Sequence, residues 1–173
     1  EEETELGVVA NFQIRDNTQL GLFLAKPTEE IDLLVESKRI EAQPFIIAAG
    51  AKEEHKLEFI FDENVHLHAI EPHLGPTATR YRAQLFYPDG LDRTLVWVPK
   101  YEQRWAASYR FATPIAAPAG TKLVLTGIFD NTKDNPENPN SPPVEVKSSP
   151  GYLNERLYAN LHYSPDDHLK LQP

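Results

Sequence analysis

Three of the six histidines lie within eight positions of one another, in the stretch ENVHLHAIEPHLG (63–75). On a β-strand, His66 and His68 project to the same face, with Cα atoms about 7 Å apart. Two imidazoles in that arrangement can share Zn²⁺ or Cu²⁺ if a third ligand reaches the ion. His73, Glu71 or His162 could supply that ligand. The spacing is therefore compatible with a metal site, with copper or zinc as the ion.

The same alternation has a simpler explanation. If Val65, Leu67 and Ala69 face the core, His66 and His68 stand on the solvated face of the strand and need no ligand. The sequence leaves both explanations open.

Other chemistries are disfavoured by what the chain lacks. It has no cysteine, and so no thiol nucleophile, and no methionine, and so no thioether for a soft metal such as copper(I). It contains no G-x-S-x-G elbow, no phosphate-binding glycine-rich loop and no H-E-x-x-H motif. A net charge of −9 argues against nucleic acid as a partner. Because no apolar run approaches the roughly 20 residues of a membrane helix, we expect no membrane insertion.

Short apolar runs separated by polar breakers predict an all-β protein, an antiparallel jelly-roll β-sandwich of about eight or more strands. The breakers include many of the 15 prolines. We expect one domain over residues 1–173, with a leading segment at 1–17 and a loose tail at 166–173. The predicted strands are residues 7–14, 19–25, 44–50, 56–61, 65–70, 80–88, 94–99, 107–112, 122–130 and 156–163, with a further strand within 27–37.

Two connections have clear sequence signals. Pro88-Asp89-Gly90 lies between two β-rich runs and predicts a hairpin. Residues 130–151 are rich in Asn, Asp and Pro and predict a long surface loop or a strap across a sheet. The oxygen ligands of this loop could bind Ca²⁺, but their spacing matches no EF-hand, which favours plain architecture. We expect Trp97, Trp105, Tyr101 and Tyr109 to pack in the core and on the sheets.

Several segments resemble one known family when they are taken in order. They are TQLGLFLAK, FIIAAGAKEEHKLEFIF, HLHAIEPHLG, RYRAQLFYPDG, VPKYEQRWAASYRFATP, PAGTKLVLTGIFDNTKDNPENPNSPP and NERLYANLHYSP. Together they resemble the C-terminal domain of the copper type II, ascorbate-dependent monooxygenases, the family of dopamine β-monooxygenase and the peptidylglycine α-hydroxylating enzymes. The resemblance covers residues 18 to 165 and implies an eight-stranded antiparallel jelly roll.

The resemblance also implies two copper ions, one held by three histidines and one held by a His-x-His pair and a Met. This chain departs from that pattern. His73 is retained where one member of the pair belongs, but its partner is missing; if His73 is the second member, Glu71 stands in for the first. Arg156, after Glu155, occupies the Met position, and Asn11 is the nearest residue to a missing upstream His. A guanidinium is permanently charged and repels a bound cation, so we expect the oxygen-activating copper site to be lost.

These departures favour a non-catalytic, monooxygenase-like module with no cofactor, an accessory or interaction domain of a larger exported protein or complex. The alternative is a metal-binding redox domain that uses a remodelled site at His66, His68 and His73. If the chain is an enzyme, the resemblance implies a copper-dependent monooxygenase. The first residue is Glu rather than Met, so we expect a chain excised from a longer protein whose other domains or subunits are its partners. The family's bacterial members imply a periplasmic or extracellular location.

Overall fold

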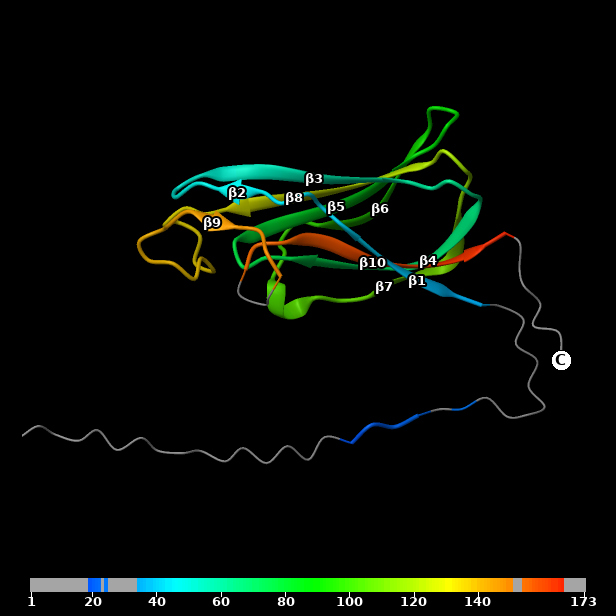
Figure 1. Ribbon diagram of the computed structural model, residues 1–173, viewed down its shortest axis with the longest axis horizontal. Coiled ribbons are helices and arrows are strands. Elements are labelled where there is room, and N and C mark those ends of the chain that lie inside the picture. Colours follow the sequence, from blue (N-terminus) through cyan, green and yellow to red (C-terminus); the bar gives the residue numbers. More distant parts are fainter. Residues whose placement is uncertain (1–18, 23, 25–33, 151–153, 167–173) are drawn as a thin grey trace, which may run out of the picture. The chain divides into compact units, whose positions relative to one another are not determined.

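The computed structural model describes residues 19–22, 24, 34–150 and 154–166 (Figure 1). The chain divides into two compact units, Glu1–Glu30 and Ile31–Pro173, and the β-sandwich lies in the second. The predicted strand at 7–14, Asn11 and residues 167–173 lie outside the described residues. The strand predicted at 19–25 is wrong for residues 19–22 and 24, which belong to no sheet although their leucines alternate.

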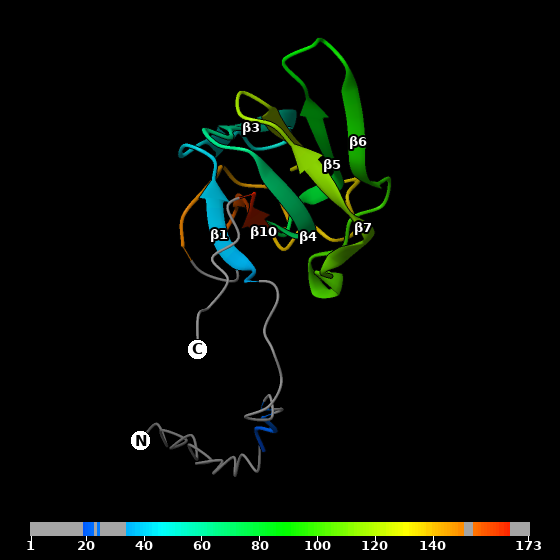
Figure 2. The ribbon, with the colours of Figure 1, turned by 90° about the vertical axis from the view of Figure 1, so that its right-hand side faces the viewer.

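Eight long strands form two four-stranded antiparallel sheets that pack face to face (Figures 1 and 2). The β4 sheet has the order β1 (Glu36–Glu41), β10 (Leu157–Pro165), β4 (Val65–Leu74) and β7 (Tyr109–Ala117). The β8 sheet has the order β3 (Lys52–Ile60), β8 (Lys122–Asp130), β5 (Ala78–Phe86) and β6 (Asp92–Val98). Two short strands, β2 (Ile46–Ile47) and β9 (Val146–Lys147), pair with each other.

The pairing folds the chain back on itself. The first long strand, β1, pairs with the last, β10; β3 pairs with β8, β4 with β7, and β5 with β6. The pairs β10–β4 and β8–β5 then complete the two sheets. This nesting of antiparallel pairs is the jelly-roll arrangement, so the predicted fold class is confirmed.

The core lies between the sheets because inward and outward residues alternate along each strand. In β10, Leu157, Ala159 and Leu161 are fully buried, and in β8, Leu123 and Leu125 face them from the other sheet. Each leucine that is fully buried in this way contributes about 1.5–3 kcal/mol to folding. Because the apolar side chains of the β4 sheet point into the core, its outer face carries polar side chains.

The predicted hairpin is confirmed. Most of the predicted strand within 27–37 lies outside the described residues, and of the described remainder, 34–37, only residues 36 and 37 belong to a strand. Gly90 adopts φ +88°, which suits glycine, and Tyr87 N–H donates to the Leu91 carbonyl (2.8 Å) across the turn. The strand in the other region is β1, which begins at Glu36. Its sequence, ESKRIE, has no apolar alternation that would predict a strand, because only Ile40 of this edge strand is buried.

Candidate functional site

The outer face of the β4 sheet gathers four of the candidate ligands. A β-bulge at His68 shifts the register of β4 against both neighbouring strands. Before the bulge, His66 and His68 point outward; after it, Glu71 and His73 point outward and Ile70 is buried. The bulge therefore places all four side chains on one face, which strict alternation would not do.

His66 and His68 each have a partner of their own. His66 Nδ1 lies 2.9 Å from Asp166 Oδ1, just beyond the end of β10. His68 Nε2 lies 2.9 Å from the buried Ser164 Oγ, on β10 itself. These contacts tie β4 to β10, and they direct the two imidazoles to separate partners.

Glu71 and His162 form a second acid–imidazole pair on this face. Glu71 Oε1 lies 3.4 Å from His162 Nε2, and Asn160 Nδ2 donates to Glu71 Oε2 (3.4 Å). Burial opposes ionisation of Glu71, but hydrogen bonds from Asn160 and Ser108 and the neighbouring His162 outweigh it and lower the pKa of the carboxyl. Glu71 is therefore held as a carboxylate. The pair lines a hollow of about 270 Å³ whose other walls are Val35, His68, Ala69, Ser108 and Arg110.

His73 lies in a cationic setting. Its ring stacks on Tyr158, with centroids 4.6 Å apart, and the Arg39 guanidinium lies 3.7 Å from the centroid of the same Tyr158 ring. Burial lowers the pKa of His73, and the charge of Arg156 lowers it further. Glu71 opposes this decrease in part, and Arg39 adds a smaller decrease. His73 is therefore a neutral imidazole at neutral pH, beside a fixed positive charge.

The backbone next to His73 is closed by Glu155. This carboxyl is 3% exposed, and its Oε1 accepts a hydrogen bond from Thr77 N–H (3.1 Å). Gly75, two residues after His73, donates from its N–H to the Arg156 carbonyl (3.1 Å). A Cβ on Gly75 would overlap Glu155 Oε2 and lie 2.5 Å from the Glu155 Cα, so position 75 has no room for a side chain. Burial raises the pKa of Glu155.

The predicted metal ligands share a face but do not converge. Among the residues that the structure describes, no three His, Asp or Glu side chains are arranged to hold a metal ion. His66, His68 and His73 are spread along β4, each with its own partner, and Glu71–His162 is a pair without a third donor. The residues at the resembled copper site do not fit that ion either, because Arg156 is a cation and Gly75 admits no imidazole.

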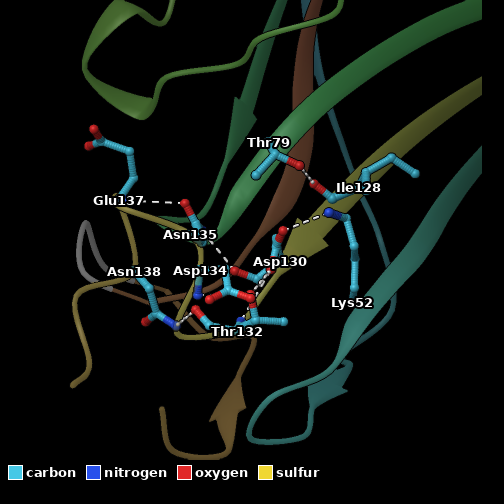
Figure 3. Close-up of polar contacts among 9 residues, drawn as sticks. All are labelled: Lys52, Thr79, Ile128, Asp130, Thr132, Asp134, Asn135, Glu137 and Asn138. Carbon is cyan, nitrogen blue, oxygen red and sulfur yellow. Dashed lines mark hydrogen bonds and ion pairs between the residues drawn. The ribbon is translucent and has the colours of Figure 1, made fainter. Parts of the chain in front are cut away.

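The Asn- and Asp-rich loop is held by its own side chains (Figure 3). Asp130 accepts from Thr132 N–H and Oγ, and its other oxygen pairs with Lys52 Nζ at 2.7 Å. Burial opposes ionisation of Asp130, but the Lys52 and Thr132 hydrogen bonds prevail and lower its pKa. Asn131, which is fully buried, donates to three backbone carbonyls. The Lys52 ammonium group thus lies beside Asp130, where a bound cation would lie. The prediction of a long loop or strap is confirmed for residues 131–145; the two residues that follow form the short strand β9.

Other residues of the site have no signal in the sequence. Ser108 and Arg110 reach the hollow from β7 and the residue before it, and Tyr158 stacks on His73 through the β10–β4 register. All three lie in segments that carry the family resemblance, but only the pairing of strands brings them to this face. The prediction for the tryptophans is wrong: Trp97 is 52% exposed and Trp105 is 77% exposed. Of the four aromatic residues, Tyr101 is the buried one and Tyr109 is half-buried.

Comparisons with known proteins leave the family of the chain open. No protein-family model matches the sequence, and no curated protein matches it. Similar solved structures include a chain of the infectious bursal disease virus Gx strain (TM-score 0.34, 6% identity, 87% of this chain and 38% of that chain). A mutant VP2 protein of that virus is similar at TM-score 0.33 and 8% identity, over 84% of this chain and 40% of that one. The chain spans about two fifths of these neighbours. Within the described residues, no helix has the length and apolar character needed to cross a membrane.

Proposed function

We propose that this chain is a non-catalytic β-sandwich module with the scaffold of the copper monooxygenase C-terminal domain and without its copper. It serves as an accessory or interaction domain, and its partners are other domains or subunits of a larger exported bacterial protein or complex. One feature carries the proposal: the resemblance implies that Arg156 takes the position of the family's Met ligand, and the charge of Arg156 acts on His73.

The electrostatics at that position oppose copper. The family's Met offers a neutral, soft sulfur donor, whereas the guanidinium is charged at any ordinary pH and donates hydrogen bonds only. Two unit charges 4 Å apart repel by about 4 kcal/mol even at an effective dielectric constant of 20. His73 itself is neutral and could ligate, so the neighbouring charge decides the outcome.

The packing around Gly75 also opposes a copper site. A second imidazole two residues after His73 would start from Gly75, where the backbone of Glu155 lies in the way. Restoring the family's pair therefore needs a movement of Glu155 as well as a new side chain.

A second candidate function is a remodelled copper or zinc site. It is favoured by the bulge at His68, which brings His66, His68, Glu71 and His73 to one face, and by His162 beside Glu71. A shift of these side chains about the hollow would bring a third donor to the Glu71–His162 pair. Such a site would serve metal carriage or redox chemistry.

One titration separates the two candidates. The full chain is titrated calorimetrically with Zn²⁺, Cu²⁺ and, in the presence of ascorbate, Cu⁺, and bound metal is counted by elemental analysis. The accessory module predicts no stoichiometric site below about 1 µM, a free energy near −8 kcal/mol. A tight 1:1 copper site that His73→Ala abolishes overturns that proposal. A 1:1 site that survives His73→Ala but is lost in Glu71→Gln or His162→Ala supports the second candidate.

A further inference from the structure

Trp105 is the most exposed aromatic side chain described in the β-sandwich, at 77%. It ends the short 3₁₀ helix η1 (Gln103–Trp105), which lies between β6 and β7. A large aromatic ring held in water costs hydrophobic free energy that burial would recover. An exposed ring on a fixed support is therefore a candidate contact for a ligand.

The support under Trp105 is well anchored. Tyr101, which is 6% exposed, accepts a hydrogen bond at its hydroxyl from Leu74 N–H (3.0 Å), and its own N–H donates to the Thr79 carbonyl (2.8 Å). Trp105 N–H donates to the Glu102 carbonyl (2.9 Å) and closes the turn. These bonds tie the segment to β4 and β5, so the backbone that carries the ring needs little ordering on binding.

Two hollows adjoin this segment. The first, of about 320 Å³, is lined by Trp105, Tyr109, Tyr101, Val98, Lys100 and Glu102. The second, of about 340 Å³, shares Tyr101 and Glu102 with the first and extends along Arg104 to Glu137 and Pro139. Each hollow has the volume of a small-molecule site. The two hollows are neighbours, because they share two lining residues.

The charged groups around the hollows are already neutralised by one another. Lys100 Nζ lies 3.0 Å from Glu102 Oε1, and Arg104 lies 3.6 Å from Glu137 Oε2. A charged ligand would have to compete with these pairs. A neutral ligand with many hydroxyl groups would instead bond to their unused donor and acceptor sites while an apolar face rests on Trp105.

From these observations we infer that the surface around Trp105 binds a neutral saccharide chain. One sugar ring stacks on the indole in the first hollow, and the next extends past Glu102 into the second. The inference deepens the proposed accessory role, because it names the ligand class of the module. It does not depend on whether copper binds.

A protein partner fits the surface less well. Protein interfaces concentrate their energy in a desolvated apolar centre, whereas two ion pairs lie around these hollows. The described exposed apolar residues around these hollows amount to one ring rather than a broad patch.

The test uses the two tryptophans as probe and control. The full chain is titrated calorimetrically with cellohexaose, xylohexaose, mannohexaose and chitohexaose, and Trp97→Phe leaves Trp105 as the sole indole for fluorescence. We expect at least one hexasaccharide to bind and to change Trp105 emission. Trp105→Ala should weaken that binding at least about tenfold, equivalent to about 1.4 kcal/mol. Trp97→Ala removes an exposed indole from β6 that lines neither hollow, and should leave the affinity unchanged.

Three outcomes overturn the inference. They are no binding of any of the four hexasaccharides, equal loss of affinity in both alanine variants, and tighter binding of a charged hexauronate, titrated in the same way, than of the neutral chains. Because Trp105 is 77% exposed, we expect Trp105→Ala to remain folded, and far-ultraviolet circular dichroism of the variant checks this. Because the readout is sugar binding, a failure here leaves the metal titration, and with it the proposed function, to be decided separately.

Discussion

Arg156 acts on His73 through its charge. Burial already disfavours the imidazolium, and the guanidiniums of Arg156 and Arg39 add to that effect, so the pKa of His73 lies below its usual value of 6.5. From the sequence, we could predict that His73 is a retained ligand position and that Arg156 replaces a Met ligand. It does not predict the stack of His73 on Tyr158, because that contact depends on how β10 pairs with β4.

Neutralising Arg156 should raise the pKa of His73. We expect the His73 proton resonances of Arg156→Gln to titrate at higher pH than those of the wild type. Arg39→Gln should raise the pKa of His73 by a smaller amount. The linked effect on stability has a definite sign. A His whose pKa is lowered by folding binds its proton more tightly in the unfolded chain, so stability falls as pH drops through about 6.5 and levels off below the folded pKa. A His73 titration that Arg156→Gln leaves unmoved would show that the charge is screened.

At the scale of elements, β4 and the turn that follows it decide the shape of the site. Alternation along VHLHAIEPHL predicts His66 and His68 on one face, and continued alternation would put Ile70 and Pro72 beside them. The bulge instead buries Ile70 and turns Glu71 and His73 outward. A bulge reflects the register of both neighbouring strands, so the sequence of β4 alone could not predict it.

Gly75 should be the least replaceable glycine of this region. In Gly75→Ala the new Cβ meets the backbone of Glu155, and neither β10 nor the buried carboxyl can move freely. We expect a loss of about 2–4 kcal/mol in the free energy of urea unfolding. Gly120→Ala is the matched control, because its φ of +86° strains a side chain while the nearest atom, Pro88 Cγ, lies at an ordinary 3.4 Å. That strain should cost about 1–2 kcal/mol. Equal losses in the two variants would remove the steric case against a side chain at position 75.

For the whole molecule, the nested pairing makes the two sheets interdependent. Successive long strands alternate between the sheets, except that β5 and β6 both lie in the β8 sheet, so neither sheet is a continuous piece of chain. Strand spacing and turn residues were enough to predict a jelly roll of about eight strands. They could not predict which strands pair, because that pairing is fixed by contacts between distant segments such as β1 and β10.

The interdependence predicts one cooperative unfolding transition for the β-sandwich. Leu161→Ala removes a fully buried side chain of β10 in the β4 sheet and should cost about 2–5 kcal/mol. Trp97 lies on β6, which belongs to the other sheet. Trp105 lies in η1, just before β7, and β7 belongs to the same sheet as β10. Trp105→Phe leaves Trp97 as the reporter, and Trp97→Phe leaves Trp105. Adding Leu161→Ala to either single-tryptophan variant should lower the unfolding free energy by the same amount relative to that variant without Leu161→Ala. If Trp97 fluorescence kept its midpoint while that of Trp105 shifted, the sheets would unfold separately and the nested pairing would not govern stability.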